Sequence, residues 1–160
     1  TQDRAVTAGF VLDSTVRYQS WAAVSMPGET DGKLVGPLGD YDGDGISNLV
    51  EYAFVGDARS GTSTHVLKGS VVEEGGNAYL EGEFHALSND SELAYTVKVS
   101  DALLDWANVE IEFNGSTWIS RNPNVVSVKS NEHEGESVWR ILVRDEVVGT
   151  RRFMELLISD

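Results

Sequence analysis

The chain has 160 residues, a usual length for a single domain, and 41% of them are hydrophobic, which is enough to build a core. Lysine and arginine together number 12 against 26 aspartates and glutamates, so the formal net charge is -14 with neutral histidines. Such acidity repels phosphate groups. It argues against nucleic acids and anionic membranes as partners and favours divalent cations and neutral or cationic surfaces.

Cysteine is absent from the chain, which excludes disulfides, iron–sulfur clusters and zinc sites built on thiolates. No stretch approaches the roughly 18 consecutive apolar residues of a transmembrane helix. Thr1–Phe10 also lacks the basic start and apolar block of a signal peptide. We therefore expect no membrane insertion, and we expect the chain to have been excised from a larger parent protein.

The first part of the chain predicts two short helices separated by a loop. Apolar residues recur at helical spacing in Asp13–Val24, and Asp13 is a candidate N-cap. Met26–Gly39 contains two prolines and several glycines, so we expect a connecting loop there. Ser47–Val55 predicts a second helix that ends near Gly56 and docks its apolar side against the sheet.

From Val66 onward the hydrophobic period changes to two, which is typical of strands. The Asn114-Gly115 dipeptide predicts a tight hairpin turn that pairs the strand of Phe113 with that of Trp118. About eight short strands with few helices predict a mainly β chain, an antiparallel β-sandwich with a small N-terminal helical part. The expected strands are Val66–Glu74, Ala78–Leu87, Leu93–Ser100, Val109–Phe113, Thr117–Ser120, Val125–Lys129, Val138–Arg144 and Arg152–Ser159.

Residues Asp40–Glu51 fit the EF-hand-like calcium loop pattern Asp-x-Asp/Asn-x-Asp/Asn-Gly-x5-Glu without a gap. Calcium takes about six to eight oxygen ligands, and carboxylates on alternate residues of a curled loop converge on it. Gly45 allows the sharp bend at position six. The predicted ligands are the side chains of Asp40, Asp42, Asp44 and Glu51, the main-chain carbonyl of Ile46, and Asn48 directly or through water.

Two features of the loop indicate a structural role for Ca²⁺ rather than a calcium-triggered opening. Ser47 replaces the aliphatic residue of position eight, and Gly36–Gly39 cannot form an entering helix. Magnesium keeps more of its own water and zinc prefers histidine or cysteine, so both fit less well. The alternative is that Asp and Gly cluster in a solvated turn. We expect one domain over residues 1–160, with the helical part and calcium loop in 1–60 and the sandwich in 61–160.

The stretch Asp40–Ala53 resembles the dockerin-like or thrombospondin-type-3-like calcium motif of C-terminal accessory regions in secreted proteins of Verrucomicrobia and Planctomycetes. Tyr95–Trp106 and Arg151–Leu156 resemble later blocks of the same regions, more loosely. Such regions are appended to sulfatases, polysaccharide lyases, glycoside hydrolases and large surface proteins. The resemblance therefore implies a secreted, extracellular or cell-surface accessory module and implies no activity of its own.

Four tryptophans are candidates for stacking on sugar rings, although most tryptophans fill cores. Trp118 follows the Asn114-Gly115 turn and Trp139 follows a polar stretch, so these two are our candidate carbohydrate contacts. Trp106 follows two leucines in a turn, and we expect it to be structural.

Residues for catalysis are not evident. His65, His85 and His133 lie far apart without a ligand spacing, so we expect surface histidines. A pair of catalytic carboxylates stays open, because the separation of such a pair is a spatial property. Arg151-Arg152 is expected to pair with nearby acids, with a sulfated glycan as the alternative.

The leading hypothesis is a non-catalytic, calcium-stabilised accessory module of a secreted polysaccharide-active enzyme, which binds a polysaccharide or a cell-surface glycan. The first alternative is a structural domain for cell-surface attachment or adhesion, without a sugar site. The second is a small polysaccharide hydrolase or lyase, which requires convergent carboxylates or a histidine base in a cleft.

Overall fold

The computed structural model describes residues 16–61, 68–135, 137–147 and 152–159. Within these ranges, three short helices are followed by eight strands. The helices are α1 (Val16–Ser25), α2 (Gly32–Val35) and α3 (Asn48–Ala53). The strands are β1 (Lys68–Glu74), β2 (Asn77–Leu87), β3 (Ala94–Ser100), β4 (Ala107–Phe113), β5 (Trp118–Ser120), β6 (Ser127–His133), β7 (Val138–Glu146) and β8 (Phe153–Ser159).

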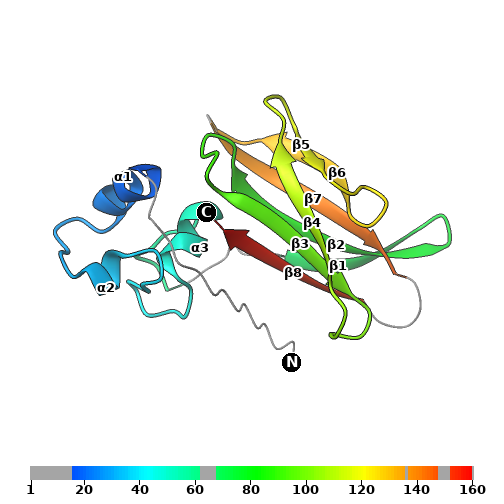
Figure 1. The fold of residues 1–160 in the computed structure, drawn as a ribbon, viewed down its shortest axis with the longest axis horizontal. Coiled ribbons are helices and arrows are strands. Elements are labelled where there is room, and N and C mark those ends of the chain that lie inside the picture. The colour runs from blue at the N-terminus through cyan, green and yellow to red at the C-terminus, as the bar shows by residue number, and fades with distance from the viewer. Residues whose placement is uncertain (1–15, 62–67, 136, 148–151, 160) are drawn as a thin grey trace.

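The strands form two four-stranded antiparallel sheets, in the orders β1-β2-β7-β6 and β5-β4-β3-β8. The second sheet faces the viewer in Figure 1, and the helices lie together at one end of the two sheets. Each sheet turns one face of alternate apolar residues to the other, as period-two sequences require. The mainly β antiparallel sandwich predicted from the sequence is confirmed. Its inward residues include Phe84, Ala86, Ile141 and Val143 of the first sheet, and Tyr95, Val97, Val109, Ile111, Leu156 and Ile158 of the second.

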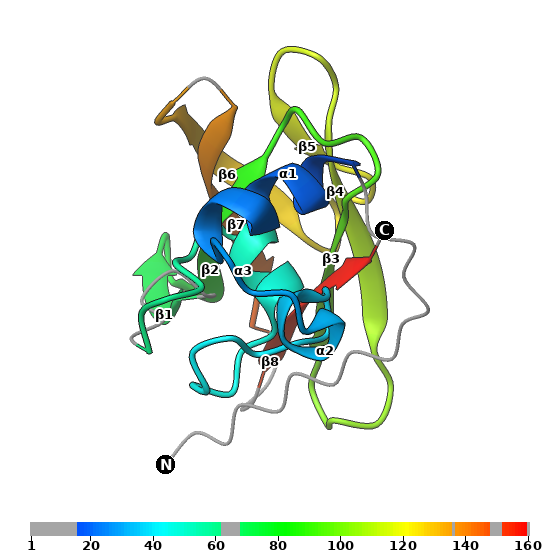
Figure 2. The same cartoon turned by 90° about the vertical axis from the view of Figure 1, so that its left-hand side faces the viewer.

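Helix α3 docks against the sandwich through its apolar side, as the sequence predicts. The ring of Phe54, just after the helix, lies with its centroid 6.2 Å from that of Phe84 and 5.9 Å from that of Tyr95. These residues belong to one buried cluster that runs from the helices into both sheets. Figure 2, viewed from the helical end, shows α1, α2 and α3 lying across this end of the sandwich.

Most expected elements are present with shifted boundaries. The helix expected over Asp13–Val24 is α1, and its proposed cap Asp13 lies outside the described residues. The expected loop over Met26–Gly39 contains the single-turn helix α2, which the pattern missed. A local side-chain bond explains it, because the carboxylate of Asp31 caps the turn by accepting the N–H of Lys33 at 2.9 Å.

The strand expected over Val125–Lys129 begins later, at Ser127, and continues to His133. A turn displaces its start, since the N–H groups of Val125 and Val126 donate to the carbonyl of Asn122 at 3.0 and 3.1 Å. Val126 is fully buried and fills the core from that turn. The first strand begins at Lys68, and the two residues expected before it lie outside the described ranges.

The predicted hairpin pairs Phe113 with Trp118, as expected. Four residues, Asn114 to Thr117, separate the paired strands, so the turn is longer than the two-residue turn that the dipeptide suggests. The side chain of Asn114 accepts the N–H groups of Ser116 and Thr117 at 3.0 and 2.9 Å, and Gly115 adopts a φ of +94°. Only the glycine of the pair uses the left-handed region, which is why the turn extends.

None of the helices in the described part of the chain has the length and apolar character needed to span a bilayer.

Candidate metal centre

The segment Asp40–Glu51 forms a loop whose two ends are held together by the main chain. The N–H of Asn48 donates to the carbonyl of Gly39 at 2.7 Å, and the N–H of Leu49 donates to the carbonyl of Pro37 at 3.0 Å. These bonds close the loop at the point where α3 begins. The loop is therefore anchored to the helix that docks on the sandwich.

The bends of the loop occur at two glycines with positive φ, Gly43 at 78° and Gly45 at 91°. The bend predicted at Gly45 is confirmed. A residue with a Cβ pays for this conformation with steric strain, whereas glycine does not. The side chain of Asp40 stabilises the bends, since its Oδ1 accepts the N–H of Gly43 at 2.8 Å and its Oδ2 accepts the N–H of Gly45 at 2.8 Å.

The loop brings three of the predicted ligands together. Asp40, Asp42 and Asp44 each offer a carboxylate oxygen, and these oxygens all lie within 4.8 Å of one another. Further hydrogen bonds of the group are local. The N–H of Asp44 donates to Asp40 Oδ1 and to Asp42 Oδ1, both at 3.2 Å, and the N–H of Ile46 donates to Asp44 Oδ1 at 2.8 Å. Three carboxylates at this separation repel one another unless protons or a cation are present.

Glu51, at the twelfth position, is the most unusual of the acidic residues. It is only 3% exposed, and its Oε2 has no hydrogen-bond partner among the described residues. Burial, and then the charges of Asp42, Asp44 and Asp40, raise the pKa of Glu51 to about 7. The buried Oδ2 of Asp42 also lacks a partner within the described ranges, and burial raises the pKa of that side chain too. A buried carboxylate without a partner is costly, so these oxygens fit a bound cation.

Asn48, at the ninth position, makes hydrogen bonds within the framework of the loop. It is fully buried, its Oδ1 accepts the N–H of Tyr41 at 3.2 Å, and its amide nitrogen donates to the carbonyls of Leu34 at 2.6 Å and Gly36 at 3.0 Å. Asn48 therefore stabilises the framework of the loop, and its part in binding an ion, directly or through water, stays a prediction. Only the folded segment shows this, because Leu34 and Gly36 precede the loop by several residues.

The donor set fits a hard divalent cation. Its side-chain oxygens come from carboxylates, and the group contains no histidine or cysteine. The carbonyl of Ile46 is the one predicted ligand that comes from the main chain, and its part in binding stays a prediction. When bound, Ca²⁺ would compensate the negative charges of the four carboxylates of Asp40, Asp42, Asp44 and Glu51.

Trp118, the first candidate for sugar stacking, is only 4% exposed. Its ring packs against Tyr95 with a centroid distance of 5.3 Å and against Phe113 at 5.7 Å. Stacking on a sugar requires an accessible ring face, so the prediction for Trp118 is wrong. The residue lies on the inward face of the second sheet, which the turn beside it does not reveal.

Trp139, the second candidate, is half-buried. Its ring lies 5.5 Å from that of Phe113 and 4.9 Å from that of His133, and its indole N–H donates to the hydroxyl of Ser88 at 3.2 Å. These contacts hold the ring between the two sheets, near the end of the β6–β7 pair. A sugar contact at Trp139 stays a prediction.

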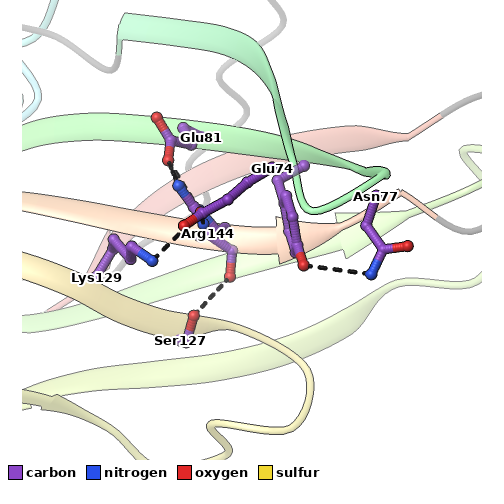
Figure 3. Close-up of polar contacts among 7 residues, drawn as sticks. Glu74, Asn77, Glu81, Ser127, Lys129 and Arg144 are labelled. Atoms are coloured by element: carbon purple, nitrogen blue, oxygen red, sulfur yellow. Dashed lines mark hydrogen bonds and ion pairs between the residues drawn. The ribbon is translucent and has the colours of Figure 1, made fainter.

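Charged side chains cross the outward face of the first sheet in a paired network. The guanidinium of Arg144 donates to Glu81 at 2.8 Å and also pairs with Glu74, which Lys129 approaches to 3.5 Å. Figure 3 shows Arg144 reaching from its strand toward both glutamates. These cations are already neutralised by carboxylates, which argues against a site for anionic ligands on this face.

Two further predictions concern basic residues. Arg152 pairs with the buried Asp145, whose Oδ1 accepts the Arg152 Nη2 at 3.2 Å, so the expected pairing with an acid is confirmed for this arginine. Its neighbour at 151 and His65 lie outside the described residues. His133 is exposed, whereas His85 is partly buried and lies 2.9 Å from a carboxylate oxygen of Glu134.

The chain was compared with protein-family models, with curated proteins and with solved structures, and none of the three comparisons found a match.

Proposed function

We propose that this chain is a calcium-stabilised, non-catalytic accessory module of a larger secreted protein that acts on polysaccharide, and that the module binds glycan. The observation that carries the calcium part is the buried Oε2 of Glu51, which has no partner among the described residues, beside a cluster of three aspartates whose charges help to raise the pKa of Glu51. The fit of the loop to the calcium pattern supports the same assignment.

The proposed role of the ion is architectural. Binding relieves the repulsion among Asp40, Asp42, Asp44 and Glu51, and Glu51 belongs to α3, whose last residues lie in the common core. A ligand that binds only the folded state stabilises it by mass action, by about 2.7 kcal/mol at 100 times its dissociation constant. Calcium is therefore expected to stabilise the whole domain rather than the loop alone.

Thermal unfolding tests the calcium proposal. The protein is melted in CaCl₂, in MgCl₂ and in EGTA, and the expected result is a clear rise of the melting temperature in CaCl₂ alone. The variant Asp42→Ala/Asp44→Ala is expected to lose this rise. The matched control, Glu73→Ala/Asp105→Ala, removes two exposed acidic residues outside the loop and is expected to retain it. A melting curve of the wild-type protein that is unchanged by calcium contradicts the proposal.

The glycan part of the proposal is tested by affinity electrophoresis on a panel of soluble polysaccharides, with calcium and with chelator, and by an assay for released sugars on the same panel. Retarded migration without sugar release is the expected result. Sugar release would favour the hydrolase or lyase alternative.

The attachment domain without a sugar site is the second candidate, and the burial of Trp118 favours it. It predicts unchanged migration on every polysaccharide while the calcium effect on melting persists.

A further inference from the structure

The outward face of the second sheet carries a hollow that none of the predicted contacts occupies. Its cavity volume is about 540 Å³, and the residues around it come from β3, β4 and β8 and from the segment just after β5. This volume falls within the range of about 300 to 1,000 Å³ that is typical of small-molecule sites. The sheet in question faces the viewer in Figure 1.

Strand register builds the hollow from distant segments. Thr96 of β3 pairs with Glu110 of β4 on one side and with Leu157 of β8 on the other, so these three outward side chains form one row across the sheet. The N–H of Arg121 donates to the carbonyl of Glu110 at 2.9 Å and extends the row past β5. Asn108 lies two residues before Glu110 and therefore on the same face.

The lining of the hollow suits a polyhydroxylated ligand. Asn108 and Asn122 present amides, and Thr96 presents a hydroxyl, so the hollow offers both donors and acceptors. Leu157 is partly buried and supplies an apolar patch. Sugars combine hydroxyl groups with apolar ring faces, and ligand sites commonly place a few polar groups around an apolar floor.

Around the hollow two cations stand against three carboxylates, and this excess of negative charge disfavours an anionic ligand. Arg121 pairs with Glu112 and approaches Glu110 to 4.0 Å, and Lys98, in the next row, lies 2.9 Å from a carboxylate oxygen of Glu155. The chain as a whole carries a net charge of -14, so an anionic polymer is repelled. No such penalty applies to an uncharged sugar chain.

The outward face of the second sheet continues beyond the hollow. Along β4 the lining of the hollow runs from Asn108 to Glu110. On the other side of Asn108 lies Trp106, half-buried, with the ammonium of Lys98 5.0 Å from its ring centroid. An extended polar track of this kind matches a linear chain better than a single small molecule.

We propose that this face, around Thr96, Asn108, Glu110, Arg121 and Asn122, is the glycan-binding surface of the domain and that it takes a neutral, unbranched polysaccharide segment. The inference rests on the proposed function and places its glycan site on the opposite side of the second sheet from Trp118. The site is separate from the metal loop, which lies at the helical end.

The test uses affinity electrophoresis of the whole domain in calcium, on gels with hydroxyethylcellulose, xylan, galactomannan or a linear β-1,3-glucan, and on gels with alginate as the anionic polymer. The variant Asn108→Ala/Arg121→Ala is compared with Asn77→Ala/Lys129→Ala. The control variant removes the same numbers of amides and positive charges from the opposite sheet, where Asn77 and Lys129 are exposed (Figure 3).

Wild-type protein is expected to be retarded by at least one neutral polysaccharide. Binding by Asn108→Ala/Arg121→Ala is expected to be about thirtyfold weaker, since two lost hydrogen bonds cost about 2 kcal/mol. The control variant is expected to bind within about twofold of wild type, and both variants to melt like wild type. In ¹⁵N spectra, an oligosaccharide of the retarding polymer is expected to shift the amide signals of Thr96, Asn108 and Glu110.

Equal binding by wild type and Asn108→Ala/Arg121→Ala would overturn this inference. The proposed function would still stand, because the glycan site would then lie elsewhere. Retardation by alginate alone would overturn the assignment to neutral ligands. Absence of retardation on every gel would overturn both this inference and the glycan part of the proposed function. The calcium part would not be affected, because thermal unfolding tests it independently.

Discussion

The hydroxyl of Tyr95 donates a hydrogen bond of 2.9 Å to the carbonyl oxygen of Ala53, and so joins the central region of the second sheet to the end of α3. The hydroxyl oxygen of Tyr95 also accepts the N–H of Leu87, at the end of β2, at 2.9 Å. Tyr95 is 1% exposed, and burial raises the pKa of its hydroxyl above the ordinary value, so it stays protonated. A single side chain therefore connects α3, which begins within the acidic loop Asp40–Glu51, with both sheets.

Replacing Tyr95 with phenylalanine tests this connection. The change Tyr95→Phe leaves the carbonyl of Ala53 and the N–H of Leu87 without this partner in the interior, which costs about 1 to 3 kcal/mol of the free energy of unfolding. Urea denaturation at fixed calcium measures the loss. Tyr79→Phe is the control, because the Tyr79 hydroxyl accepts only a long hydrogen bond of 3.5 Å from exposed Asn77. This control variant is expected to be as stable as wild type. Equal stabilities of the two variants would show that the Tyr95 hydroxyl contributes nothing.

The raised pKa of Glu51 predicts that the calcium-free protein loses stability as the pH rises. The folded-state pKa of about 7 lies above the ordinary value of 4.5, so the folded protein holds this proton more tightly than the unfolded chain does. The contribution is fully present below the ordinary pKa, declines between the two values and is lost above about 7, and it is on the order of 3 kcal/mol. Calcium is expected to remove this decline by compensating the carboxylate charge.

Chelated wild-type protein and Glu51→Gln are compared by urea denaturation at about pH 5 and about pH 8. The variant carries no titrating group at this position, so its stability is expected to fall less over this range, and its calcium affinity is expected to be weaker. Parallel pH profiles for the two proteins would contradict the assignment of the raised pKa to Glu51.

The change Asn48→Asp separates the framework role of Asn48 from the role of a calcium ligand. An aspartate cannot donate to the carbonyls of Leu34 and Gly36, so the variant is expected to lose about 2 to 4 kcal/mol of stability both in calcium and in chelator. If Asn48 instead acts mainly as a direct ligand, the variant is expected to bind calcium as tightly as wild type, or more tightly. Calorimetric titration with calcium, together with urea denaturation, decides between them.

Asp40 and Asp42 are expected to respond differently to removal. The carboxylate of Asp40 accepts backbone N–H groups at both bends, whereas Oδ2 of Asp42 has no partner in the described part of the chain. Asp40→Asn is therefore expected to destabilise even the chelated protein, by about 1 kcal/mol. Asp42→Asn is expected to leave the chelated protein as stable as wild type, or more stable, because it removes repulsion. Both variants are expected to bind calcium more weakly, as measured by calorimetry. Identical melting of the two chelated variants would argue against this division.

The sandwich could be predicted from the sequence because strand formation and facing are local properties. In β2 the alternation of Leu80, Gly82, Phe84 and Ala86 with polar residues already states which side faces inward, since successive side chains point to opposite faces. The loop pattern likewise identifies Asp40, Asp42 and Asp44, because their convergence depends on a dozen consecutive residues. Helix α2 was missed because the cap of Asp31 outweighs the surrounding prolines and glycines in a single turn.

The amino-acid sequence by itself determined the mainly β class, the order of the strands along the chain and the acidic loop before α3, all of which depend on residues close to one another in the chain. Only the tertiary structure decided that Trp118 is buried, that the amide of Asn48 is used by Leu34 and Gly36, and that Thr96, Glu110 and Leu157 share one outward row. The physical reason is that the burial of Trp118, the partners of Asn48 and the pairing of these three strands depend on which distant segments meet, and residues close together in the chain do not specify that.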